Sequence, residues 1–91
     1  MDVSYESALE IAERLLDAEV RRSLDEEVVI NLKTVQETPH FWVFFYNTRA
    51  FIETKSMVHS LAGNGPVLVE KATGRARIGR SDIDWPKQVG M

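Results

Sequence analysis

The chain has 91 residues, 44% of them hydrophobic and 27% charged, with no cysteine and a formal net charge of -3. This composition predicts one folded domain over residues 1–91 and excludes disulfides and thiolate metal sites, which suits the reducing cytoplasm where we expect the protein to act. It argues against a membrane span, because no apolar run reaches roughly 18 residues, and against a signal peptide, because the first residues are acidic.

The first expected element is an amphipathic helix at about residues 4–22. Ser4 can cap its start, because a serine hydroxyl accepts hydrogen bonds from the free N–H groups of a first turn. Two ion pairs are expected on its surface from their spacing, Glu10 with Arg14 and Asp17 with Arg21. Apolar residues recur at helical spacing and predict the buried stripe: Tyr5, Ala8, Leu9, Ala12, Leu15 and Leu16.

Charge is distributed unevenly along the chain. Residues 1–40 carry ten acidic residues against four Lys and Arg, a balance of -6, whereas residues 41–91 carry four against seven, a balance of +3. The acidic half argues against nucleic acid as a partner. The acidic side of the helix is either a solvated surface or a protein-contact face. The candidate contact residues on it are Glu6, Glu10, Glu13 and Asp17.

Two β-strands are expected next, over residues 27–37 and 41–47. In the first, Val28, Ile30 and Leu32 alternate with polar residues, which indicates one solvent-exposed face and one buried face. A proline lies in the short connection between the strands and marks a turn. The short connection favours an antiparallel hairpin.

The second of these strands, "FWVFFYN", is the most apolar run in the chain. Its two sides would carry Phe41, Val43 and Phe45 on one, and Trp42, Phe44 and Tyr46 on the other. One side must pack under the helix. The other is either a second core face or a partly exposed aromatic row that contacts a partner. The candidate contact residues on this strand are Trp42, Phe44 and Tyr46.

The second half of the chain predicts the rest of a sheet. Residues 48–62 are consistent with either a short helix or an irregular crossover. Strands are expected at 66–71 and 75–79, and the tail after them is too short, and too interrupted by Pro86, for a substantial element. The prediction is an α+β fold with the N-terminal helix packed on a four-stranded antiparallel sheet.

A glycine-rich stretch, "LAGNGP", precedes the third strand. Its Gly63 and Gly65 partly match a dinucleotide-binding fingerprint, but that site needs a further glycine and a helix after it, and here a strand follows. No Walker motif is present either. Gly63-Asn64-Gly65-Pro66 instead predicts a tight turn of residues that tolerate positive φ, with a proline at the start of the strand.

A second turn, "KATGR", joins the last two strands. Gly74 fits a type I turn closed by a left-handed glycine. That three-residue loop places Leu68 opposite Ile78. A two-residue loop would pair Val69 with Ile78, and we expect the first arrangement because Thr73 is poorly suited to positive φ.

Nothing in the sequence predicts an active site. His40 and His59 lack partners at metal-ligand spacing, and no GxSxG nucleophile elbow is present. The carboxylates of the helix are expected to face solvent, and a solvated surface does not adapt a carboxylate to general acid–base catalysis. We therefore expect no enzyme activity, metal or cofactor.

Two segments, "FWVFFYNTRAFIET" and "LAGNGPVLVEKATGRARIG", resemble the YrhB-like domain, also called the immunity protein 35 family. The resemblance covers about residues 5–80. It implies an N-terminal helix, an aromatic strand, a Gly-Asn turn and a final hairpin. Members of the family are taken to be bacterial immunity proteins that bind and block a cognate toxin domain, so the resemblance implies a protein partner and no catalysis.

The leading hypothesis is therefore a non-enzymatic immunity-type protein. Its acidic helix face, supplemented by aromatic side chains, would suit a toxin with a basic active site. Two alternatives remain: a small chaperone-like holdase that binds unfolded chains, and a self-associating regulatory module. The sequence leaves the oligomeric state open.

Overall fold

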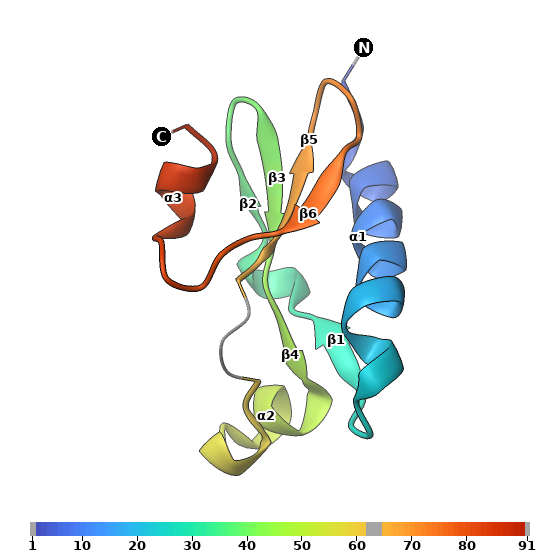
Figure 1. Ribbon diagram of the computed structural model, residues 1–91, viewed down its shortest axis with the longest axis vertical. Coiled ribbons are helices and arrows are strands. Elements are labelled where there is room, and N and C mark those ends of the chain that lie inside the picture. Colours follow the sequence, from blue (N-terminus) through green and yellow to red (C-terminus); the bar gives the residue numbers. More distant parts are fainter. Residues whose placement is uncertain (1, 62–64, 91) are drawn as a thin grey trace.

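The structure is a computed structural model that describes residues 2–61 and 65–90. Helices and antiparallel strands are mixed along the chain (Figure 1). In chain order, the helices and strands are α1 Tyr5–Glu19, β1 Val28–Ile30, β2 Gln36–Glu37, β3 Phe41–Phe44, β4 Tyr46–Thr48, α2 Arg49–Thr54, β5 Val67–Glu70, β6 Ala76–Ile78 and α3 Trp85–Gln88. Short 3-10 turns occupy Arg21–Ser23, Leu32–Thr34 and Met57–His59.

The strands form two antiparallel sheets. The larger sheet has the order β2-β3-β5-β6, and the smaller one pairs β1 with β4. Helix α1 lies on one side of the larger sheet and α3 on the other, while α2 lies at the far end beside β4 (Figure 1). The N-terminal helix and the four-stranded antiparallel sheet confirm the expected α+β fold.

Helix α1 forms much as the sequence predicts. The Ser4 hydroxyl oxygen accepts a hydrogen bond from the Ser7 N–H at 3.2 Å and caps the first turn. Ala8, Ala12 and Leu16 are fully buried against the sheet. The α-helix ends at Glu19, before the expected position 22, because the chain tightens into a 3-10 turn.

Residue alternation along the strands creates two cores. On the α1 side, Phe44, Val67 and Val69 pack with the helix. On the α3 side, Val43 and Leu68 pack with Val89 of the tail. Both sides of the aromatic strand are therefore core faces, and the two sets of alternating residues lie on opposite sides as predicted.

The expected hairpin is antiparallel but is not continuous. Asn31 uses its side chain to accept from the Lys33 N–H at 3.1 Å, and this turn starts the 3-10 segment that follows. The ladder is thereby split, with β1 pairing β4 and β2 pairing β3. Leu32, expected on the buried face, is consequently 59% exposed.

The register of the last hairpin also differs from the expected one. Val67 lies opposite Ile78, not Leu68, and Val69 lies opposite Ala76. Ile78 packs against the helix-side core, and a one-residue shift in register would turn its side chain to the opposite face of the sheet. The connection is a four-residue loop, Lys71 to Gly74, and Gly74 has the expected left-handed conformation with φ of 76°.

Of the predicted glycine turn, Gly63 and Asn64 lie outside the described residues. Gly65 is described and is buried. A Cβ added to it would overlap the carbonyl of Gly79 and lie 2.8 Å from the carbonyl oxygen of Arg80. Next to it, the Pro66 carbonyl accepts from the Gly79 N–H at 2.7 Å, so a close approach of two backbones requires glycine here.

Two short helices occupy the segments that the sequence left least defined. The Thr48 hydroxyl oxygen accepts from the Phe51 N–H at 3.0 Å and caps α2, so residues 48–62 do contain a short helix. In the tail, Pro86 lies in the first turn of α3, where its missing N–H costs nothing. The tail thus forms a short helix that the sequence does not predict, and Val89 after it is buried.

Candidate partner-binding surface

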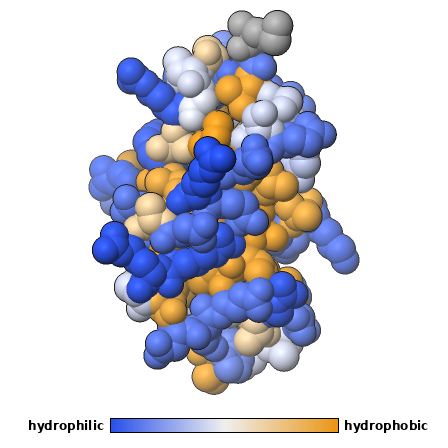
Figure 2. Space-filling model, turned by 90° about the vertical axis from the view of Figure 1, so that its right-hand side faces the viewer, coloured by the Kyte–Doolittle hydropathy of each residue, from blue (hydrophilic) through white to orange (hydrophobic). Residues whose placement is uncertain are grey.

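The outward side of α1 carries the acidic residues singled out in the sequence. Figure 2 shows this side of the molecule, where hydrophilic side chains predominate and hydrophobic groups appear between them. Glu6 and Glu10 are exposed, and neither forms an ion pair with a residue that the structure describes, so the expected pair of Glu10 with Arg14 is not formed. These two carboxylates are therefore available to a partner.

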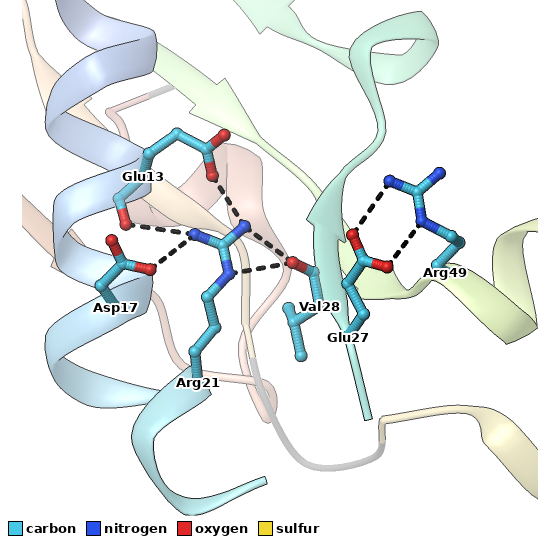
Figure 3. A network of polar contacts seen from close by, with 6 residues as sticks. All are labelled: Glu13, Asp17, Arg21, Glu27, Val28 and Arg49. Carbon is cyan, nitrogen blue, oxygen red and sulfur yellow. Dashed lines mark hydrogen bonds and ion pairs between the residues drawn. The ribbon is translucent and has the colours of Figure 1, made fainter. Parts of the chain in front are cut away.

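Glu13 and Asp17 are engaged differently, because both contact Arg21 (Figure 3). The Arg21 guanidinium donates to Glu13 Oε1 at 2.7 Å and to Asp17 Oδ1 at 3.0 Å. The same group donates to the Val28 carbonyl oxygen through Nε at 2.9 Å and Nη2 at 2.7 Å. We call this set of four residues the Arg21 clamp. The predicted Asp17–Arg21 pair is confirmed and is part of a larger network.

The electrostatics of the Arg21 clamp are those of a structural site. Partial burial lowers the pKa of Arg21, but hydrogen bonds and charge attraction from Glu13 and Asp17 outweigh this and raise it. The guanidinium is therefore a permanent cation that balances one of these two acids. The acidic helix face thus consists of a free pair, Glu6 and Glu10, and a tied pair, Glu13 and Asp17.

A second charged group lies on the other side of β1. Arg49 forms two hydrogen bonds with the Glu27 carboxylate, at 2.9 and 3.0 Å (Figure 3). The hydrogen bond from Arg49 holds the pKa of Glu27 below its usual value. Nearby, His59 Nδ1 lies 2.8 Å from Glu26 Oε1. Glu27 is therefore balanced by a cation from α2, and Glu26 is in polar contact with the turn that follows α2.

Trp42 is held by contacts within the chain. Its indole N–H donates to the Val3 carbonyl at 3.0 Å, and its ring meets that of Tyr5 edge-on at 5.6 Å. Lys71 Nζ lies 5.0 Å from the centre of the Trp42 ring and 2.6 Å from Glu37 Oε2. The ring is half-buried between α1 and the sheet.

The other two aromatic candidates differ in burial. Phe44 is fully buried in the helix-side core, so the expectation that it contacts a partner is wrong, because β3 is covered on that side by α1. Tyr46 is half-buried, and its hydroxyl is enclosed without a hydrogen-bond partner among the described residues. Burial raises the pKa of Tyr46 to about 12.

The described residues contain no group of three or more His, Cys, Asp and Glu side chains placed to bind a metal. None of the helices within residues 2–61 and 65–90 has the length and apolar character to cross a membrane. What the surface offers chemically is fixed charge beside packed aromatic groups, which suits recognition of a macromolecule.

Sequence reasoning missed the role of Arg21. Its spacing from Asp17 signalled an ion pair, but the contact with the Val28 carbonyl joins residues from two elements and has no local sequence signal. Sequence reasoning also missed a cleft near α2, because its walls come from segments far apart in the chain.

The family model for Immunity protein 35 matches residues 6–86, which is most of the chain. This match confirms the family resemblance seen in the aromatic strand and the final hairpin. No curated protein and no solved structure matches the chain.

Proposed function

Because the chain belongs to the immunity protein 35 family, we propose that it binds a cognate toxin domain and blocks it without catalysing a reaction. The observation that carries this proposal is the family match over residues 6–86, which includes α1, both sheets and the start of α3. The toxin would be inhibited by occlusion of its active site.

We place the first contact surface on the outward side of α1, around Glu6 and Glu10. Both carboxylates are exposed and unpaired within the described part of the chain, so they lose no ion pair on binding. Glu13 and Asp17 extend the negative field but remain held in the Arg21 clamp. Trp42 has an intramolecular role in this proposal, because its indole N–H is already bonded to Val3.

A partner that suits this surface carries positive charge around its active site, as a nuclease does. Opposite charges accelerate the encounter of two proteins and orient them before contact. The acidic balance of residues 1–40 supports the same sign of complementarity. The exposed carboxylates would then cover the groups that bind the toxin's anionic substrate.

The test is an inhibition titration with a candidate toxin domain, sought among the genes that neighbour the one encoding this chain. We expect loss of toxin activity with a sharp end point at one immunity protein per toxin, and growth rescue when both are expressed together. The matched control is an unrelated acidic protein of similar size. Full toxin activity in a large excess of the folded chain would refute the proposed function.

A second candidate function, a holdase for unfolded chains, is favoured by three exposed apolar side chains. Leu32, Met57 and Val58 are 59%, 76% and 86% exposed. Exposed apolar groups can bind the apolar segments of other chains. This candidate predicts concentration-dependent suppression of the aggregation of unrelated proteins, and that suppression should fall when the three residues are replaced by Ser.

A further inference from the structure

A cleft of about 470 Å³ lies at the junction of the smaller sheet, α2 and α3. Its volume is within the range of ordinary ligand sites. Phe45 and Trp85 meet edge-on at 6.0 Å, so its aromatic wall is built by side-chain packing. The apolar part of the lining is Phe45, Tyr46, Phe51, Ile52 and Trp85.

The cleft carries a positive charge at its edge. Of the described residues that line it, Lys55 alone is charged, and this lysine forms no ion pair with any described residue. Its ammonium lies 6.0 Å from the centre of the Phe51 ring. A cation beside an apolar cleft complements an anion that is attached to an apolar group.

The backbone of Lys55 gives an independent reason to single it out. Lys55 ends α2 in the left-handed conformation, with φ of 61° and ψ of 17°, and it is the non-glycine residue with positive φ within residues 2–61 and 65–90. Glycine is the usual residue at such a position, because a side chain there is strained. A lysine in a strained backbone conformation at the edge of a cleft points to a use for its side chain.

From these observations we propose that the cleft receives a large apolar side chain of the toxin partner, with a neighbouring carboxylate of the same partner paired to Lys55. The proposal rests on the proposed function, because it takes the partner to be a protein. It adds a second contact region, of opposite charge to the outward side of α1. Tyr46 keeps the partner-contact role expected from the sequence, now as part of this cleft.

The cleft can be tested without the toxin, using N-acetylphenylalanine and its uncharged amide as probes. The two tryptophans of the chain provide the readout in nitrogen–proton NMR spectra. The Trp85 indole signal should shift on titration, together with the side-chain amides of Asn31 and Gln36, which also line the cleft. The Trp42 indole, bonded to Val3 on the other side of the sheet, is the internal control and should not move.

The variants Lys55→Gly and Lys55→Gln separate charge from strain. We expect wild type to bind the carboxylate probe at least about threefold more tightly than the amide. Both variants should bind the two probes with equal affinity. Lys55→Gly should melt at the same temperature as wild type or higher, because glycine relieves the left-handed strain. The proposal would be overturned if Trp85 showed no saturable shifts or if both probes bound with equal affinity. It would also be overturned if the free probe bound with micromolar affinity, because that would indicate a small-molecule site.

The toxin itself gives the decisive comparison. Lys55→Glu, at an exposed position, and Ile52→Glu should weaken toxin binding at least tenfold while melting curves stay cooperative. Unchanged toxin binding in both variants would overturn the cleft proposal and leave the proposed function standing. Saturable probe binding in a chain that does not inhibit the toxin would instead refute the proposed function alone.

Discussion

Arg21 donates two hydrogen bonds to the carbonyl oxygen of Val28, and this contact ties the end of α1 to β1. The guanidinium can bind this carbonyl and two carboxylates at once because its donors are arranged in a planar fork. A lysine ammonium at the same position could not reproduce this geometry. The orientation of α1 against the smaller sheet therefore depends on this side chain.

We predict that Arg21→Lys lowers the free energy of unfolding by about 1–3 kcal/mol, because a partly buried charged hydrogen-bond network loses its donors. Urea unfolding of purified protein measures the change. The matched control is Arg22→Lys, since Arg22 is exposed and makes one long contact of 3.5 Å to the Ala18 carbonyl. Equal losses in the two variants would show that the Arg21 clamp contributes nothing specific.

We predict that Gly65→Ala destabilises the protein by several kcal/mol, because the added Cβ would overlap the Gly79 backbone, which cannot move as a flexible side chain could. Gly90→Ala is the control, since Gly90 has φ of 80° but an added Cβ would meet no other atom within 4 Å. That substitution should cost about 1 kcal/mol from backbone strain alone. If urea melts give Gly65→Ala the smaller loss, the close approach of the two backbones is not what requires glycine.

We predict an alkaline loss of stability that depends on Tyr46. Burial raises its pKa in the folded protein from 10.0 to about 12, so the folded state disfavours the phenolate. The stabilising contribution is complete below pH 10 and is lost as the pH rises through 12, because the unfolded chain ionises first. Thermal melts at pH 9 to 12 should show a smaller loss for Tyr46→Phe than for wild type. Equal losses of thermal stability in Tyr46→Phe and wild type would contradict the burial of the Tyr46 hydroxyl.

We predict that Trp42→Ala costs about 3 kcal/mol of folding stability, because it removes a packed ring and leaves the Val3 carbonyl without its donor. Phe at this position should restore most of the packing but not the hydrogen bond, with an intermediate loss. Chemical denaturation of both variants tests the order. A near-neutral Trp42→Ala would contradict the intramolecular role and return the residue to the partner-contact surface.

The parts of the fold that depend on local patterns could be predicted from the sequence. The apolar stripe of α1 and the alternation around Trp42 and Phe44 are local, and both lie as predicted. The register of β5 and β6 was wrong by one residue, because loop geometry alone cannot say that Ile78 must face the helix. The break at Leu32 was missed because an Asn31 turn competes with a good strand pattern.

The candidate surface was predictable in its charge but not in its detail. The acidic residues of α1 are visible in the sequence, whereas the division into a free pair and a tied pair depends on a carbonyl contributed by Val28. The cleft was invisible because Phe45, Lys55 and Trp85 become neighbours only in the folded chain. For the same reason, the aromatic run alone could not separate the buried Phe44 from the residues that line the cleft.

In the proposed function, a basic partner is attracted to the free acidic residues of α1, Glu6 and Glu10. The direct measurement is the rate constant for association with the cognate toxin domain at low and high salt. The test variant is Glu6→Lys/Glu10→Lys, which leaves the Arg21 clamp intact. The matched control is Asp82→Lys/Asp84→Lys, which changes the net charge equally in the segment leading to α3, on the other side of the larger sheet (Figure 1).

We expect the α1 variant to associate about tenfold more slowly than wild type at low salt, with little difference at about 0.5 M salt, where exposed charges are screened. The control should remain within about twofold of wild type at both salt concentrations, since its charges lie away from the outward side of α1. Thermal melts establish that both variants are folded. Equal association rates for wild type and the α1 variant at low salt, or equal slowing in the control, would show that Glu6 and Glu10 do not attract the partner.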